Sequence, residues 1–201
     1  MAWLLVVLLI SIVMALLRGG RFLNLSEIKL RAWPLLILGF GMQAVADRLP
    51  SDETWSHDVA VTMIILSFIP LLAIAWLNRH EAGMWLVGLG VFMNFTVIAV
   101  NGGMPVLPEA ASIGLGREIT AADFDALSKH VLMDESTRLA FLGDVIPVRI
   151  IRNIVSLGDV FLAIGLCVFV EDQMRRPVRW FKHGLNQSGG GSASSRDTSA
   201  I

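Results

Sequence analysis

The sequence predicts an all-α polytopic membrane protein with about five transmembrane helices and an outer helical cap between the fourth helix and the fifth. Hydrophobic residues make up 55% of the 201 residues and charged residues only 16%, whereas a soluble domain carries roughly 25% charged residues. Mean hydropathy is +0.67. The apolar residues also gather in several runs whose lengths approach that of a bilayer-spanning helix.

The length and charge of the chain restrict its organisation and its partners. A chain of 201 residues has room for one compact domain, which we place at residues 1–183, and the Gly/Ser-rich tail at residues 184–201 is expected to be disordered. The net charge of −1 argues against nucleic acid as a partner. The single cysteine, Cys167, excludes an intramolecular disulfide. His80 and Glu81 lack the second histidine of a HExxH site, and we predict no metal and no cofactor.

The first apolar run, residues 2–17, ends on a basic cluster at Arg18 and Arg21. Because positive charge follows the run instead of preceding it, we interpret the run as an uncleaved span and not as a secretory signal. Residues 22–33 then mix apolar with charged side chains. They have two interpretations: a short helix at the headgroup level, capped by Ser26, or a loop on the surface.

The second predicted span covers residues 33–46. It begins beside Pro34, and proline suits the first turn of a helix. Gly39, Gln43 and Asp47 share one face of this helix, a pattern that favours close contact with another helix in a membrane.

The third and fourth spans are predicted at residues 58–77 and 84–100. Pro70 lies inside the third span, where it removes one backbone hydrogen bond and is expected to kink the helix. The polar turn at residues 78–81 is short, so the two spans should form an antiparallel hairpin.

The fourth span runs into Asn101, Gly102 and Gly103, followed by Met104-Pro105. Two glycines and a proline break the helix and make bare backbone available. One interpretation is a helix C-cap and turn. The other is a segment that re-enters the membrane and offers Asn101, Gly102 and Gly103 to a ligand, since irregular backbone at that depth must line protein or a water-filled cavity.

The outer cap is predicted at residues 101–147, the longest stretch outside the apolar runs. Thr120 followed by Asp123 is an N-cap signal, and apolar residues then recur at helical spacing, which predicts an amphipathic helix over residues 121–133. A second short helix is predicted over residues 134–142. A long ordered loop in a compact protein is often functional.

The fifth span, residues 150–170, contains Asp159, and a carboxylate inside a membrane helix is costly and often functional. Arg152, Ser156 and Asp159 lie at i, i+4 and i+7, and Arg149 extends the stripe. Arg152 and Asp159 are two turns apart, roughly 10 Å of rise, so they cannot pair directly. We therefore expect the partner of Asp159 on another span, with three polar candidates: Gln43, Asn94 and Asn101.

The distribution of basic residues predicts an orientation. With five spans, Lys and Arg divide ten to six between the two sides, and the first connection, the third connection and the C-terminal tail hold the ten. The positive-inside rule then places the N-terminus outside and the C-terminus in the cytoplasm. The cap at residues 101–147 would face the exterior.

Four stretches of the chain resemble a bacterial multi-span membrane-protein family that is known only as a domain of unknown function. The resemblance rests on residues 101–105, His130, residues 137–147 and residues 156–159. It covers nearly the whole chain except the tail. It implies a bacterial inner-membrane protein and supplies no activity, so no catalytic role follows from it.

Three functions remain open from the sequence. The first is a binding or accessory membrane protein that presents its outer cap to a lipid or a protein partner, with the bilayer around its helices and oligomerisation left open. Arg152 and Asp159 would then hold helices together. Another is a small proton-coupled transporter that uses Asp159, although no internal repeat is visible.

The remaining open function is an enzyme that acts on a lipid-linked or phosphate-bearing substrate at the outer leaflet. His130, Asp144 and Asp159 are its candidate catalytic groups. The arginines that could hold phosphate are Arg138, Arg149 and Arg152, and Ser156 lies on the same predicted stripe. No HxxxH, GxSxG or DxxD spacing supports a particular reaction.

Overall fold

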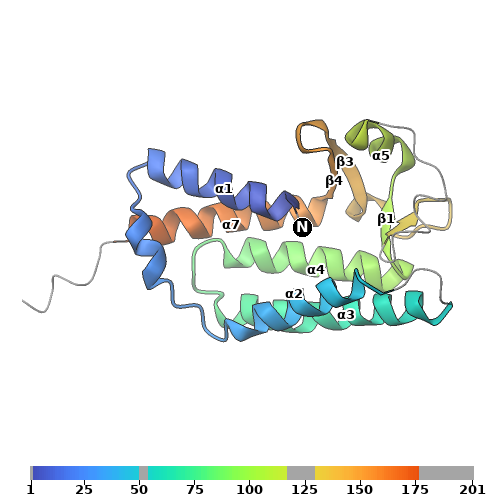
Figure 1. Cartoon of the computed structure of the whole chain (residues 1–201), viewed down its shortest axis with the longest axis horizontal. Helices are drawn as coiled ribbons and strands as arrows, with labels where there is room; N and C mark the ends of the chain where they lie inside the picture. Colours follow the sequence, from blue (N-terminus) through green and yellow to red (C-terminus); the bar gives the residue numbers. More distant parts are fainter. Residues whose placement is uncertain (1, 50–53, 117–129, 177–201) are drawn as a thin grey trace, which may run out of the picture.

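The computed structural model describes residues 2–49, 54–116 and 130–176, and it consists of a helix bundle with a small sheet at one end (Figure 1). Five helices run along the long axis of the molecule. They are α1 (Ala2–Leu17), α2 (Pro34–Ala46), α3 (Thr54–Leu77), α4 (Met84–Asn101) and α7 (Leu157–Arg175). A 3-10 turn, η1 (Phe22–Glu27), lies in the connection between α1 and α2.

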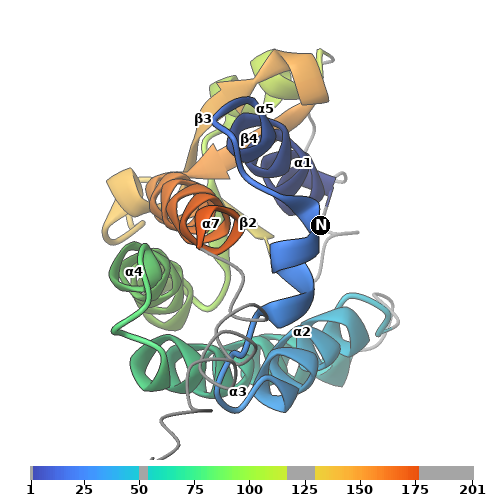
Figure 2. The same cartoon turned by 90° about the vertical axis from the view of Figure 1, so that its left-hand side faces the viewer.

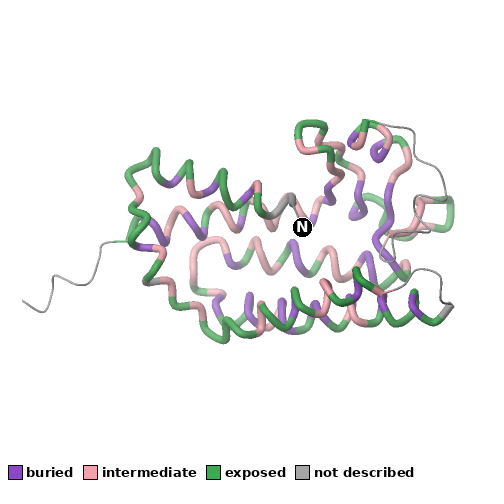
Figure 3. The backbone as a smooth tube through the Cα atoms, viewed as in Figure 1, coloured by how far each residue is buried: buried purple, intermediate pink, exposed green. Residues whose placement is uncertain are grey.

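The helices pack in the order α1, α7, α4, α3, α2, which differs from their order in the chain. Seen from one end, they form an arc whose two ends are α1 and α2 (Figure 2). Each outer helix rests on one neighbour: α1 packs on α7 and α2 packs on α3. The outward sides of α1 and α2 are therefore largely exposed (Figure 3).

In the structure the cap extends beyond residue 147 to Ser156, where α7 begins. Its described part contains a four-stranded mixed sheet with the order β2-β1-β3-β4. Its central strand β1 (Met104–Val106) is parallel to both β2 (His130–Leu132) and β3 (Asp144–Val148), and β3 forms an antiparallel hairpin with β4 (Asn153–Ser156). Helix α5 (Pro108–Leu115) packs on β3 and β4. Two 3-10 turns complete the cap: η2 (Ala140–Leu142) and η3 (Arg149–Ile151).

Helices α4 and α7 approach one another backbone to backbone through glycines. A Cβ atom on Gly90 would lie 2.7 Å from the amide nitrogen of Leu162, and one on Gly165 would lie 2.6 Å from that of Val87. Small residues allow this close packing between apolar helices. The same device joins α2 to α3, where Gly39 faces Leu71.

The predicted contact face of the second span is confirmed. Gly39 packs against α3, and the Gln43 side chain donates a hydrogen bond to Ser67 Oγ at 3.0 Å. The core beside it is formed by side chains of α2, α3 and α4, with Phe68 and Phe95 packed edge to face at 5.9 Å between ring centroids. Met104 and Leu142 of the cap join this core, so the cap and the bundle share one apolar interior.

The far end of the bundle is held by charged and polar contacts. Arg18 pairs with Glu171 at 2.9 Å, and Arg176 pairs with both Asp172 and Glu81. Burial lowers the pKa of Arg176, but its hydrogen bonds to the two carboxylates raise it more, so the pKa lies above its ordinary value. Glu81, which lies in the polar turn between the third and fourth predicted spans, is thus half-buried and paired.

The prediction of five spans is not supported. Within the described residues, two helices are long and apolar enough to cross a membrane, namely Trp55–Leu77 and Met84–Asn101. Helices α1 and α2 have 16 and 13 residues. Helix α7 starts at Leu157, and not at residue 150, and four charged residues lie along it: Asp159, Glu171, Asp172 and Arg175.

The predicted helical cap contains helix α5 but also a sheet, and the two helices predicted at residues 121–133 and 134–142 do not form over their described residues. Residues 130–132 form a strand, and residues 134–142 form turns that end in η2. Residues 121–129 of the predicted amphipathic helix lie outside the described residues. The apolar residues of this segment recur at helical spacing, but residues 130–132 instead pair with β1, a strand distant in the chain, and form a strand themselves. Ser26 also caps no helix, since its hydroxyl donates to the Leu23 carbonyl within η1.

Replacing Gly90 by alanine should destabilise the protein, because the new methyl group would meet backbone atoms of α7 that can move only if the helices separate. The expected loss is about 1–3 kcal/mol of unfolding free energy, a fall of several degrees in Tm. Thermal unfolding of the purified protein measures it. The control is Gly41→Ala in α2, where nothing lies within 4 Å of the new Cβ and helix propensity should add about 0.5–1 kcal/mol. Equal Tm changes in the two variants would contradict this account of α4–α7 packing.

Candidate functional site

Asp159 lies at the beginning of a helix and not deep inside one. Ser156 is the N-cap residue of α7, and its hydroxyl accepts a hydrogen bond from the Asp159 amide at 2.9 Å. The Asp159 carboxylate reaches back to the Ser156 amide at 3.3 Å, which completes a capping box. A carboxylate in this place also interacts favourably with the positive end of the helix dipole.

Asn94 of α4 closes this arrangement from the neighbouring helix. Its amide nitrogen donates to Asp159 Oδ1 at 2.8 Å, and its carbonyl oxygen accepts from the Ser156 hydroxyl at 2.9 Å. Of the three polar partners expected for Asp159, Asn94 is the one that the structure brings to it. We call Asn94, Ser156 and Asp159 the α4–α7 cluster. Since the three groups satisfy one another, the cluster joins the two helices where the cap begins.

The predicted stripe of Arg149, Arg152, Ser156 and Asp159 does not exist. Residues 149–156 form η3 and β4, so Arg149 and Arg152 lie in the turn of the β3–β4 hairpin, away from the α4–α7 cluster. The spacing Ser156-x-x-Asp159 is a helix-start signal. That signal, together with the β-branched residues at 154 and 155, was available in the sequence and indicates that a strand ends where the helix begins.

The Asn101 to Gly103 segment forms a helix C-cap, as one of its two interpretations predicted. Gly102 adopts a left-handed conformation with φ of 69°, and the Gly103 amide donates to the Ile98 carbonyl at 3.2 Å. The Asn101 side chain donates to the Arg138 carbonyl and accepts from the Arg138 amide. Asn101 and Arg138 thus meet through the backbone of Arg138, which fastens the loop before η2 onto the end of α4.

His130 and Asp144, named together above among the candidate catalytic groups, are neighbours in the folded chain. They begin β2 and β3, which flank the central strand β1. His130 Nε2 lies 3.8 Å from Asp144 Oδ2, and the two side chains are only 20% and 10% exposed. Within the described residues no group of three or more His, Cys, Asp and Glu residues is placed to hold a metal ion.

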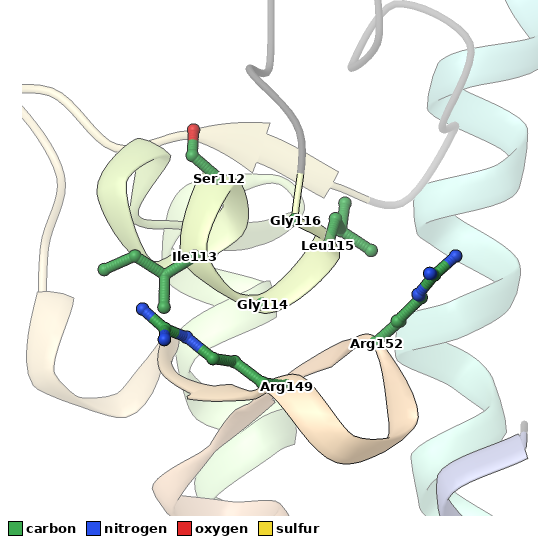
Figure 4. Close-up of a pocket in the computed structure, with 7 residues that line it drawn as sticks. All are labelled: Ser112, Ile113, Gly114, Leu115, Gly116, Arg149 and Arg152. Atoms are coloured by element: carbon green, nitrogen blue, oxygen red, sulfur yellow. The ribbon is translucent and has the colours of Figure 1, made fainter.

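Arg149 and Arg152 line a hollow of about 500 Å³ beside the last turn of α5 (Figure 4). In the described part of the chain, neither guanidinium takes part in an ion pair or hydrogen bond. Figure 4 shows the two side chains pointing away from one another, that of Arg149 toward Ile113 and that of Arg152 to the opposite side, past Leu115. A second hollow, of about 390 Å³, lies between α3 and α4 at the opposite end and is mostly apolar.

Comparison with known proteins identifies the family. Residues 27–171, more than half of the chain, match the model of a family of unknown function, DUF5317, and the chain belongs to that family. A protein of Thermotoga maritima, described as uncharacterized, is 27% identical over 167 residues, which cover 81% of this chain and 87% of the relative. No solved structure matches the chain.

Removing the hydroxyl of Ser156 should weaken the junction between α4 and α7. Ser156→Ala loses the helix cap and leaves the Asn94 carbonyl oxygen without its donor in a partly buried place, so we expect a loss of about 1–2 kcal/mol in unfolding free energy. Thr96→Val is the matched control, because the Thr96 hydroxyl bonds only to Phe92 of its own helix, and it should cost about 0.5 kcal/mol or less. Equal stability of the two variants in thermal unfolding would show that the cluster does not join the helices.

Proposed function

We propose that this member of a family of unknown function is a bacterial inner-membrane protein whose bundle lies in the bilayer and presents the cap at the outer surface as a binding or accessory module. The observation that carries the proposal is that the polar candidate side chains form hydrogen bonds with other parts of the fold. Asn94, Asn101, Ser156 and Asp159 all bond within the fold and thereby fasten the cap to the bundle.

Exposed apolar and aromatic side chains support the placement in a bilayer. Large hydrophobic residues cover the outer faces of α1 to α4 and are exposed to a degree unusual for a soluble bundle. Trp33, Trp76 and Trp85 are exposed at the end opposite the cap, and Trp55 is exposed at the cap end. Tryptophans at the two ends of an apolar layer are typical of membrane interfaces. Helices α3 and α4 would cross the layer, and α1, α2 and α7 run beside them along the same axis, so that α7 would return the chain from the cap to the opposite side.

The positions of the arginines support an outward-facing cap. The end opposite the cap carries seven Lys and Arg residues of the described chain: Arg18, Arg21, Lys29, Arg31, Arg79, Arg175 and Arg176. The cap end of the described chain carries four, namely Arg48, Arg138, Arg149 and Arg152. The positive-inside rule favours the more basic end in the cytoplasm.

A binding module is favoured over a transporter because Asp159 is committed to a structural task. A coupling carboxylate must exchange protons along a path through the membrane. Asp159 instead lies at the start of α7, where it accepts hydrogen bonds from Asn94 and from the Ser156 backbone. Transport would require this junction to break in every cycle.

An acid–base enzyme is the second candidate, and the contact between His130 and Asp144 is the observation that favours it. A carboxylate beside a histidine can orient the imidazole and stabilise its charged form. The two side chains are mostly buried in the sheet, and burial of this kind is also common where a histidine only supports the fold.

Native mass spectrometry of protein extracted gently from its own membrane tests the binding module against the enzyme. We expect a stoichiometric protein or lipid companion on the wild type, unchanged in mass and amount in His130→Gln. His80→Gln, in the exposed turn opposite the cap, is the control for general effects of losing a histidine. A bare monomer would contradict the binding module. A companion lipid whose mass differs between wild type and His130→Gln would instead indicate chemistry at His130.

The orientation is tested with C-terminal fusions. Green fluorescent protein fused after residue 201 should fluoresce, and alkaline phosphatase fused there should be inactive, because the first folds in the cytoplasm and the second only outside it. The matched control is the same pair of reporters fused before residue 1, where the pattern should reverse. Active alkaline phosphatase at the C-terminus would place the cap in the cytoplasm.

A further inference from the structure

The turn of the β3–β4 hairpin carries an unusual combination of side chains. Its four residues, Arg149, Ile150, Ile151 and Arg152, are called here the hairpin tip. Ile150 is 96% exposed, the highest value among the exposed large hydrophobic residues of the described chain. Both flanking arginines are exposed as well. A lone exposed isoleucine is ordinary, but here it stands at the end of a projecting hairpin between two cations.

The hairpin tip is held firmly in this exposed position. Val148 pairs with Asn153 at the base of the turn, and the Arg152 amide donates to the Arg149 carbonyl at 3.2 Å. Arg152 adopts a left-handed conformation with φ of 49°, which a residue with a side chain adopts only when its surroundings require it. Helix α5 packs closely on the hairpin, since a Cβ on Gly114 would lie 2.7 Å from the Asn153 carbonyl oxygen.

The hairpin tip lies at the periphery of the bundle, close to the level at which α1 and α7 begin. Figure 1 shows the β3–β4 hairpin rising away from the bundle axis, with its turn on the side of the N-terminal end of α1. Figure 2 shows the hairpin beyond α1 on the same side of the molecule. The tip therefore lies beside the N-terminal end of α1, a helix with many exposed apolar side chains, and we place the boundary of a surrounding bilayer at this level.

The charge of the hairpin favours an anionic surface. Residues 145–155 contain two arginines and no acidic residue. Neither guanidinium is engaged by another side chain in the described part of the chain. The two side chains diverge on either side of the last turn of α5 (Figure 4), so they are poorly placed to clamp one small anion between them. A surface with many phosphate groups can satisfy both at once.

We propose that the hairpin tip is an interfacial membrane anchor: Ile150 enters the boundary between headgroups and acyl chains, and Arg149 and Arg152 bind phosphates of anionic phospholipids. Arginine suits this place because its stem can cover apolar surface while the charged group reaches the phosphates. The inference rests on the membrane-embedded bundle proposed above. It assigns a second membrane contact to the protein, made by the cap.

Site-directed spin labelling of the full chain in nanodiscs tests the anchor. With Cys167 replaced by alanine, a nitroxide is attached at Ile150→Cys, and its collisions with oxygen and with a water-soluble nickel complex are measured in bilayers of phosphatidylglycerol and phosphatidylcholine. Two control positions complete the set: Leu9→Cys on the exposed face of α1, and Glu135→Cys on an exposed loop of the cap.

The expected result is a label at position 150 that, like the label at position 9, is reached by oxygen and protected from nickel, while the label at position 135 is reached by nickel. Arg149→Gln combined with Arg152→Gln should lower the ratio of inserted to exposed tip on the order of tenfold in the anionic bilayer. The side chains replaced at positions 9, 135, 149, 150 and 152 are exposed, so folding should persist, and the partly buried Cys167 is replaced by alanine in every sample alike. Millimolar inorganic phosphate should leave the signal unchanged.

Each other outcome has a distinct meaning. Nickel access at positions 150 and 135, with protection at position 9, would overturn the anchor and leave the membrane-embedded bundle in place. Nickel access at position 9 would overturn the bundle proposal itself. Protection at position 150 that survives loss of both arginines would contradict their binding to lipid phosphate. Loss of protection on adding phosphate would assign the arginines to a free anion.

Discussion

The rest of the structure depends on the close approach of α4 and α7. Gly90 and Gly165 let the two backbones touch, and Asn94 fixes the register by bonding to Ser156 and Asp159. Because α4 leads into β1 and β4 leads into α7, this single contact also sets the distance between two strands of the cap. The sheet is therefore built onto the bundle at the place where the bundle is most tightly packed.

The bundle was largely predictable from the sequence, whereas the cap was not. Apolar runs predicted the positions of α1 to α4 within a few residues because hydropathy is a local property. The sheet pairs Met104 with His130 and Asp144 with Ser156, and such distant pairings leave little trace in a single sequence. Asp159 also shows how a local signal can be read in two ways. Its residue type suggested a charge within a membrane, while the Ser156 three residues earlier marked the beginning of a helix.

The candidate residues separate into groups that the sequence could not distinguish. Asn101 and Gly102 lie at the end of α4, and Ser156 and Asp159 at the beginning of α7, so these residues have structural tasks at helix ends. His130 and Asp144 meet in the sheet, although 14 positions of chain separate them. Arg149 and Arg152 are held outward by a strained turn. Polarity alone suggested a role for all of them, and only the geometry separates those that support the fold from those that face outward.

The direct passage from β4 into α7 has a mechanical consequence. Ser156 ends the strand and Leu157 begins the helix, with no flexible residue between them, and Ser156 is fully buried. The β3–β4 hairpin and α7 are therefore expected to move together as one rigid unit, which rotates about the contact with Asn94. A helix in a bilayer adjusts its tilt to the thickness of the hydrocarbon layer. In the membrane-embedded bundle proposed above, such a tilt of α7 would move the far end of the hairpin, so the position of the cap would change with the thickness of the bilayer.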